Sequence, residues 1–310
     1  TVLSNVVFLW CDLLLMQSYM DAVRHVYERG EDVLNERTGS YTRSIAGLTI
    51  SHDCSKSFPI PTARRVALRI AFEEMMFFFR GQTDTTLLEE KNIGIWKGNT
   101  TREFLDDRGL HYLEVGDMGK GYGYQWRNFF GVDQLKRCFE QLLTNPSSRQ
   151  NLVSAWNPAQ LDQMALPPCH FSFQPLVRNG RVDLNVFLRS NDLPYGTPYN
   201  LMGYGFLLEC MVNFMRNNGS DVVVGKLNLM IGDAHIYKNQ MVGEGAFVYK
   251  MIERYYEIQL KLDHTNPAPK LEICKSLHTF EDFLSLQWED LNLHNYKPQD
   301  DYKDKPMMVA

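Results

Sequence analysis

Residues 166–200 read LPPCHFSFQPLVRNGRVDLNVFLRSNDLPYGTPYN, and this stretch decides the fold class. Two runs inside it, Phe171–Val177 and Val182–Leu188, are rich in β-branched and aromatic residues and have the length of strands. Directly after it, Asn200–Asn217 is long and mostly apolar, which predicts a helix. Strands followed by a long helix indicate a chain that mixes both kinds of element.

The flanking sequence continues this alternation. Residues 116–123 are rich in glycine and predict a flexible loop, too irregular for a dinucleotide-binding fingerprint. No repeat and no linker rich in Pro, Gly or Ser divides the chain, so the sequence predicts one α/β domain over residues 1–310. The remaining predicted elements are strands at Ser44–Ile50, Asn151–Trp156 and Val222–Ile231 and helices at Met16–Gly30 and Arg64–Phe79.

Charge and composition narrow the classes of partner. A net charge of −5 argues against a general nucleic-acid or anionic-membrane surface, so any phosphate must be bound locally. The apolar run Val6–Met16 is interrupted by Asp12 and is shorter than the roughly 20 residues of a membrane span, so a buried or interface segment is predicted. The 6 cysteines have neither disulfide-framework nor metal-site spacing, which favours a reducing, cytoplasmic setting without a metal.

The first candidate for chemistry is Cys169, which follows Pro167 and Pro168 and precedes His170. Prolines fix the backbone, so the cysteine is held at a defined point. A lone cysteine is also often a small buried hydrophobe, and the local sequence leaves both interpretations open.

Two later segments add polar side chains at fixed spacing. Arg189 follows an apolar run, and we expect it to be buried with an anionic partner such as phosphate or carboxylate. His235 and Tyr237 are two positions apart at the end of a predicted strand, so both side chains point to one face.

Four motifs, LPPCH at 166–170, RSND at 189–192, GTPYN at 196–200 and GDAHIY at 232–237, together resemble the thymidylate synthase family. The resemblance runs from about Asn35 to the C-terminus and leaves residues 1–30 as a poorly matched N-terminal extension. It implies an α/β (α+β) fold of the thymidylate synthase type. That fold is a large mixed β-sheet packed with helices, with one sheet face forming a homodimer interface.

The resemblance also implies a covalent reaction on dUMP. In that family a cysteine thiolate adds to carbon 6 of dUMP, which makes carbon 5 nucleophilic toward the methylene group of 5,10-methylene-tetrahydrofolate. Cys169 matches this cysteine, and Arg189 is the matching cation. A free cysteine is mostly protonated at neutral pH, so a nearby positive charge is needed to favour the thiolate.

Phosphate binding is implied for several arginines, which together suit a dianion. By resemblance, Arg37, Arg189 and Ser190 bind the dUMP phosphate, and Arg149 reaches it from the second subunit of a homodimer. Gln150 stands where the family usually has another arginine, which weakens this site.

The base and the sugar have their own matches. Asn200 matches the asparagine that donates to uracil O4 and accepts from N3–H, a pattern that cytosine reverses. His235 and Tyr237 match the residues that bond the deoxyribose 3′-hydroxyl, although a core histidine is the alternative for His235. His170, beside the nucleophile, is also predicted to bind substrate.

Two further residues are implied to move protons. Glu74 resembles the glutamate that organises water around the pyrimidine O4, and a raised pKa suits that role. Tyr122 resembles the tyrosine that helps to remove the carbon-5 proton, although Lys120 and Gly121 stand where most relatives have proline and valine.

Folate contacts complete the implied site. Asp192 matches the residue that accepts a hydrogen bond from the pterin and is also predicted to take part in catalysis. The other predicted folate contacts are Trp96, Asn99, Gly196 and Ala310.

Two other functions remain open from the sequence. A dUMP 5-hydroxymethylase shares the early steps but adds water instead of hydride, and the choice depends on water exclusion. Leu188, Ala310 and residues 201–203 (Leu-Met-Gly) depart from the usual synthase near that seal. A non-catalytic nucleotide- or RNA-binding relative is the remaining alternative, and the intact cysteine motif and acidic charge argue against it.

Overall fold

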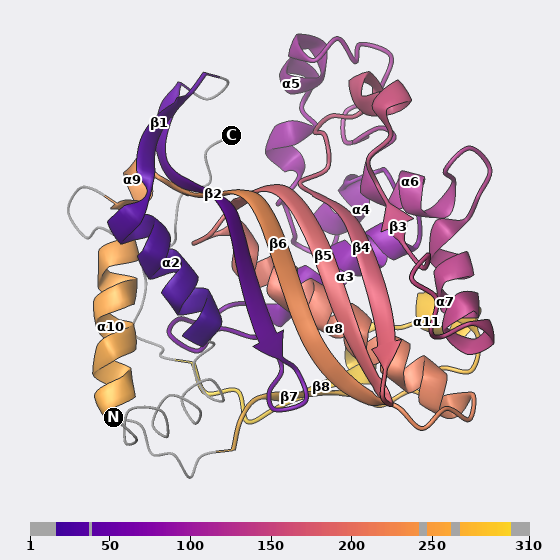
Figure 1. The fold of residues 1–310 in the computed structure, drawn as a ribbon. Coiled ribbons are helices and arrows are strands. Elements are labelled where there is room, and N and C mark those ends of the chain that lie inside the picture. Colours follow the sequence, from indigo (N-terminus) through magenta and orange to yellow (C-terminus); the bar gives the residue numbers. More distant parts are fainter. Residues whose placement is uncertain (1–16, 37–38, 242–246, 262–266, 299–310) are drawn as a thin grey trace.

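The computed structural model describes residues 17–36, 39–241, 247–261 and 267–298. The large sheet has 6 strands in the order β1-β2-β6-β5-β4-β3, and β7 and β8 form a separate 2-stranded sheet (Figure 1). Strands β5 and β6 pair in parallel, whereas β1–β2, β2–β6, β3–β4 and β4–β5 are antiparallel. The sheet is therefore mixed, as predicted. The strands are β1 Glu31–Asn35, β2 Ser40–Asp53, β3 Val153–Ser154, β4 His170–Arg178, β5 Arg181–Asp192, β6 Val223–Tyr237, β7 Lys270–Ile273 and β8 Leu291–His294.

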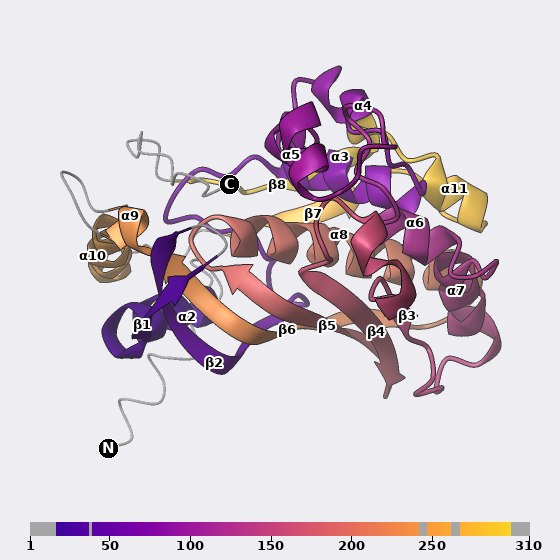
Figure 2. The same ribbon diagram turned by 90° about the horizontal axis from the view of Figure 1, so that it is seen from above.

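Helix α8 covers one face of the large sheet, and α3 packs against α8 (Figure 2). Helix α2 packs against β2 and β6 and buries Tyr19, Val23 and Val26. Among the described residues, no helix combines the length and the apolar character needed to cross a bilayer. The helices are α2 Gln17–Arg29, α3 Leu68–Phe79, α4 Thr86–Glu89, α5 Arg102–Asp107, α6 Tyr122–Arg127, α7 Gln134–Thr144, α8 Gly196–Asn217, α9 Lys238–Met241, α10 Phe247–Lys261 and α11 Phe280–Leu284, with short 3-10 turns η1 Lys97–Asn99, η2 Pro158–Gln163 and η3 Trp288–Asp290.

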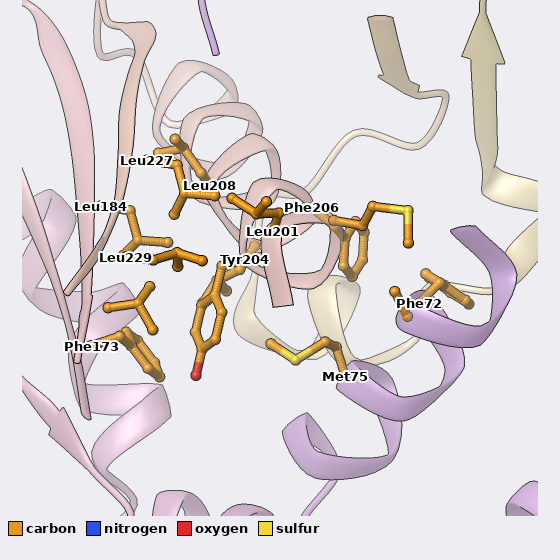
Figure 3. Close-up of a cluster of buried hydrophobic side chains, with 14 of the residues drawn as sticks. Phe72, Met75, Phe173, Leu184, Leu201, Tyr204, Phe206, Leu208, Leu227 and Leu229 are labelled. Atoms are coloured by element: carbon orange, nitrogen blue, oxygen red, sulfur yellow. The ribbon is translucent and has the colours of Figure 1, made fainter. Parts of the chain in front are cut away.

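The core lies between the sheet and α8 (Figure 3). Leu184 in β5 and Leu227 and Leu229 in β6 are fully buried and face α8, which contributes Leu201 and Tyr204. Alternation along each strand sends these side chains to one face, and burying a leucine of this kind contributes roughly 1.5–3 kcal/mol. The apolar core thus fixes how β5, β6 and α8 lie relative to one another.

The opposite face of the sheet has one group of polar side chains and one pair of aromatic side chains. Ser51 Oγ donates to Asn228 Oδ1 at 2.7 Å, and Asn228 Nδ2 donates to Asn185 Oδ1 at 3.0 Å. Phe171 and Phe187 are half-buried neighbours with ring centroids 6.4 Å apart. This face is therefore less completely covered than the one under α8.

Two predicted bounds are wrong, each because of long-range contacts. Helix α3 begins at Leu68 rather than Arg64, since Arg64 Nη2 donates to the carbonyl of Pro194 at 2.8 Å and Val66 N–H donates to Tyr296 Oη at 3.0 Å. Pairing with β1 and β6 lengthens the strand predicted at Ser44–Ile50 to 40–53.

Two further elements also differ from the prediction. The strand predicted at Asn151–Trp156 contracts to β3, residues 153–154, because only these two residues pair with β4. Helix α8 begins at Gly196, four residues before Asn200, so the GTPYN motif is its first turn. The run predicted at Val6–Met16 lies outside the described residues.

Candidate active site

Cys169 immediately precedes β4 and lies beside Arg189 of the neighbouring strand β5. The backbone N–H of Arg189 donates to the Cys169 carbonyl at 2.9 Å, so strand pairing sets their relative position. The guanidinium donates through Nε to the Pro168 carbonyl at 3.0 Å and through Nη2 to the Pro167 carbonyl at 2.9 Å. Nη2 is also 3.5 Å from Cys169 Sγ. A guanidinium at this distance attracts the negative charge of a thiolate.

The prediction that Arg189 is buried is wrong. Arg189 is exposed, whereas Leu188 before it is 1% exposed and packs in the core. Side chains alternate between the two faces of a strand, so the apolar residues of β5 send Arg189 to the other side. Its charge is therefore open to a ligand.

Tyr122 is the second side chain that contacts Cys169. Its hydroxyl oxygen accepts a hydrogen bond from the Cys169 backbone N–H at 2.9 Å. The ring packs against both Phe78, with centroids 4.7 Å apart, and His170, with centroids 4.4 Å apart. Burial, reinforced by the neighbouring Cys169, raises the pKa of Tyr122 well above its ordinary value. Tyr122 therefore stays protonated near neutral pH, with its oxygen held at the backbone N–H of Cys169.

The loop that carries Tyr122 is paired with the segment that leads to Cys169. Gly119 forms an isolated bridge with Met164, and Lys120 N–H donates to the Gln163 carbonyl at 3.0 Å. A side chain at Gly123 would place its Cβ 2.3 Å from the carbonyl oxygen of Phe78, so the helix α6 can approach α3 only with glycine there. Backbone hydrogen bonds thus fix the position of the glycine-rich segment at residues 116–123.

Glu74 is held by Trp96 on the same side of the site. Trp96 Nε1 donates to Glu74 Oε1 at 2.9 Å, and the Trp96 ring packs edge-on against Tyr122 with centroids 5.8 Å apart. Burial raises the pKa of Glu74 to about 7, against the opposing effect of the Trp96 hydrogen bond. A raised pKa suits the proton relay that the resemblance implies for Glu74. We call Cys169, Arg189, Tyr122, Trp96 and Glu74 the Cys169 cluster.

His170 lies beneath Tyr122 rather than at the surface. It is 6% exposed, and its Nδ1 is 2.7 Å from Tyr204 Oη. Burial lowers the pKa of His170 to about 3, so the imidazole is neutral at physiological pH. In this position it supports the Tyr122 ring, and direct contact with substrate stays a prediction.

The carboxyl end of β5 and the end of β6 bring the sugar and phosphate candidates together. Ser190 Oγ is 3.4 Å from His235 Nδ1, and Asp233 Oδ2 is 3.2 Å from the same nitrogen. The His235 and Tyr237 rings lie 5.2 Å apart, and both residues are buried. Parallel pairing of β5 and β6 creates this grouping.

Asp192 has both carboxylate oxygens engaged. Gln240 Nε2 donates to Oδ2 at 3.0 Å, and Tyr195 N–H donates to Oδ1 at 3.2 Å. Burial raises the pKa of Asp192. A carboxylate oxygen accepts more than one hydrogen bond, so these contacts orient the group and leave capacity for a folate donor.

Sequence reasoning missed the residues that hold the Asp192 loop. Gln240 in α9 is 1% exposed, Tyr19 Oη donates to the Leu193 carbonyl at 3.1 Å, and Arg64 is 8% exposed beside Pro194. The signal available was weak, because a buried glutamine or tyrosine has no special pattern in sequence. These contacts link α2 and α9 to the end of β5.

The other predicted site residues lie outside the groups described above. Asn99 is 8% exposed in η1, and Arg149 is exposed, with its carbonyl accepting from Gln174 Nε2 at 2.8 Å. Asn200 and Gly196 lie in the first turns of α8. Arg37 and Ala310 lie outside the described residues.

Comparison with known proteins decides the family. Residues 17–309 match the family model described as thymidylate synthase. The chain belongs to the thymidylate synthase family. The match begins at residue 17 and so includes α2, which the quoted motifs do not cover.

Individual relatives agree with this assignment. The chain is 34% identical over 305 residues to a thymidylate synthase of Herpesvirus ateles, covering 94% of this chain and 97% of the relative. Bifunctional dihydrofolate reductase-thymidylate synthases are similar too. The identity is 36% over 280 residues in Paramecium tetraurelia and 35% over 293 residues in Arabidopsis thaliana. These alignments cover 86% and 90% of this chain but only 57% and 52% of the two relatives.

Membership in the thymidylate synthase family confirms the predicted resemblance and the predicted mixed α/β fold. It also confirms the enzyme class, a one-carbon transferase of the methyltransferase type. The family binds dUMP and uses 5,10-methylene-tetrahydrofolate as cosubstrate.

Proposed function

We propose that this chain is a thymidylate synthase that converts dUMP to dTMP by reductive methylation with 5,10-methylene-tetrahydrofolate. The observation that carries the proposal is the Cys169 cluster: Arg189 Nη2 lies 3.5 Å from the sulfur, and the Tyr122 hydroxyl oxygen lies 2.9 Å from the Cys169 backbone nitrogen. One cation and one phenol thus lie at a single cysteine, and the cation favours the thiolate form that acts as a nucleophile.

Cys169 is the nucleophile in this proposal. Its sulfur forms a bond to carbon 6 of dUMP, and the electron pair of the 5,6 double bond moves to carbon 5 and O4. Arg189 is exposed beside the sulfur, so it can meet both the thiolate and the dianionic phosphate. Ser190, the next residue, and Arg37 add phosphate contacts, with His235 and Tyr237 on the sugar.

Proton transfer is assigned to Glu74 and Tyr122. A carboxyl group with a pKa of about 7 exchanges its proton readily at neutral pH, which suits relay through water to the pyrimidine O4. Tyr122 has its oxygen held at the backbone N–H of Cys169 and helps to remove the proton from carbon 5. Trp96 connects the two groups, because it bonds to Glu74 and packs against Tyr122.

The folate supplies the one-carbon unit and the hydride, and Asp192, Trp96, Asn99 and Gly196 are the residues that we assign to its binding. The carboxylate of Asp192 suits a pterin because it is an acceptor fixed by Gln240 and the Tyr195 backbone.

A synthase is favoured over a hydroxymethylase because two departures near the site, Leu188 and Gly203, have packing explanations. Leu188 is 1% exposed in the core. At Gly203 a Cβ would lie 2.7 Å from Met75 Cγ, so glycine there makes room for a side chain of α3 rather than for water. Mass analysis of the product made from dUMP and 5,10-methylene-tetrahydrofolate tests this directly. We expect a methyl group at carbon 5, and a hydroxymethyl group overturns the assignment.

We also propose a symmetric homodimer in which the less covered face of the sheet is the interface. Phe171 and Phe187 are half-buried on that face, and the Gln174 side chain ties the backbone of Arg149 to the same strand. Arg149 is exposed, so its side chain is available to the phosphate site of a second subunit.

Mixing two inactive variants tests the shared site. Arg149→Ala chains mixed with Cys169→Ala chains should regain activity, because each hybrid dimer contains one site with both residues intact. Confirmed hybrids without any regained activity would contradict the contribution of Arg149.

The same proposal covers domain organisation and location. Residues 1–310 act as one catalytic domain with residues 1–30 as an N-terminal extension, and the chain works in the cytoplasm. A catalytic thiol must remain reduced, and the cytosol keeps thiols reduced. Microscopy of the tagged chain tests the location.

A further inference from the structure

We infer that Asn191 is a positioning residue that fixes the side-chain amide of Asn200 in the orientation that reads uracil. The inference rests on the proposed function and deepens it, because it assigns base choice to a residue outside direct contact with the base. Asn191 is on β5, 5% exposed, and Asn200 is near the start of α8.

The orientation of Asn191 is set by Thr197. Thr197 is fully buried, and its Oγ1 donates to the backbone carbonyl of Asp192 at 3.4 Å. With its single hydrogen used in this way, Oγ1 acts as an acceptor, and Asn191 Nδ2 donates to it at 2.9 Å. The Asn191 amide therefore directs its nitrogen to Thr197 and its oxygen away from it.

The oxygen of Asn191 meets Asn200. Asn200 Nδ2 donates to Asn191 Oδ1 at 3.2 Å. Gly196 leaves space for this contact, because a Cβ there would lie 2.9 Å from Asn191 Oδ1. Asn200, Asn191 and Thr197 thus form a chain of donors that all point the same way and end on the Asp192 carbonyl, an arrangement in which each bond polarises the next.

This chain of hydrogen bonds decides what Asn200 presents to a base. One hydrogen of Asn200 Nδ2 is used on Asn191, which leaves the other hydrogen and Oδ1 on the free edge of the amide. A donor beside an acceptor matches O4 and N3–H of uracil. The rotated amide would match cytosine, but it would place Asn200 Oδ1 against Asn191 Oδ1, two acceptors without a hydrogen between them.

The test is a pair of variants at Asn191, read by the dissociation constants of dUMP and dCMP in titration calorimetry without folate. Asn191→Leu has similar volume and no polar group, and we expect the preference for dUMP to fall about fivefold to tenfold. Asn191→Asp keeps an acceptor toward Asn200 and should retain the preference within about twofold. Asn213→Leu is the matched control, since Asn213 is a hydrogen-bonded asparagine farther along α8, and the preference should not change.

The same substitution made in an Asn200→Ala chain shows whether Asn191 acts through Asn200 or whether its loss disturbs the structure in general. In Asn200→Ala chains, Asn191→Leu should change the preference no further, whereas an equal change there overturns the inference. Thr197→Val provides a second route if Asn191→Leu does not fold, and it should lower the preference in the same direction by a smaller factor. An unchanged preference in either folded variant also overturns the inference. A wild-type chain that does not prefer dUMP contradicts the proposed function itself.

Discussion

Two regions beside α8 contain a carboxyl group with the same perturbation but different neighbours. Burial raises the pKa of Glu74 to about 7 in the Cys169 cluster, and burial raises the pKa of Glu209 to about 7 in a groove between α8 and β7. The groove has a volume of about 450 Å³ and is lined by Glu209, Asn213, Arg216, Asn217, Lys270, Glu272, Cys274, Lys275 and His294, among others.

The difference lies in what each carboxyl group meets. Glu74 accepts from Trp96, which packs against Tyr122, whose oxygen is bound to Cys169. Glu209 has the charge of Arg216 as its opposing influence, while Cys274 in the same groove accepts a hydrogen bond from Asn292 Nδ2 at 3.1 Å. A perturbed pKa therefore marks burial, and only a connected set of reactive groups marks catalysis.

The thiols give the largest expected contrast between the two regions. Cys169→Ala should lower turnover at least about a thousandfold because it removes the nucleophile, while dUMP still binds. It should also abolish the covalent adduct with 5-fluoro-dUMP and folate. Cys274→Ala is the control and should keep wild-type turnover. Near-normal turnover in the Cys169→Ala chain would remove the basis of the comparison.

The two buried carboxyl groups, Glu74 and Glu209, give the second largest expected contrast. Glu74→Gln keeps the acceptor for Trp96 but cannot relay a proton, so we expect kcat to fall about a hundredfold. The pH–rate profile should lose its inflection near 7, the value to which burial raises the pKa of Glu74. Glu209→Gln should keep both kcat and the inflection. Equal losses in the two variants would show that burial alone, and not the neighbours, determines the effect.

Base reading is the third contrast, since Asn200 and Asn213 lie on the same helix. Asn200→Asp should lower kcat/KM for dUMP and raise that for dCMP relative to it. The ratio should move about tenfold to a hundredfold, because each unpaired buried polar group costs roughly 1–3 kcal/mol. Asn213→Asp should leave the ratio unchanged. A wild-type preference for dCMP, or an unaltered ratio in Asn200→Asp, would contradict the substrate assignment.

The pH dependence of the free energy of unfolding should be similar for the two regions. Each carboxyl group has its pKa raised from 4.5 in the unfolded chain to about 7 in the folded one, so the folded state binds its proton more tightly. The contribution of each carboxyl group to the free energy of unfolding is therefore highest at a pH below its pKa in the unfolded chain. It falls as pH rises from about 4.5 to about 7. Either Glu→Gln variant should reduce this loss by about 1–3 kcal/mol. Urea unfolding at several pH values measures it, and a loss that persists in both variants points to other groups.

The sequence by itself indicated the family and most of the elements, and it gave Cys169 as the candidate nucleophile. The motif around Cys169 and the alternation of β4 and β5 follow from local patterns. Period-two spacing also placed His235 and Tyr237 together on β6, because that geometry is a property of a single strand.

Tertiary structure decided the details that depend on residues far apart in the chain. Arg189 is exposed rather than buried because the sheet packs its Leu188 face against the core, and one residue of alternation reverses the environment. The start of α3 depends on Pro194 and Tyr296, which are more than a hundred residues away from the positions that they hold. The contacts of Tyr122 with Cys169, of Gly203 with Met75 and of Asn191 with Asn200 likewise arise only when separate elements pack. Propensity and periodicity act over a few residues, whereas these hydrogen bonds and close approaches are fixed by how β5, α3 and α8 meet in the folded core.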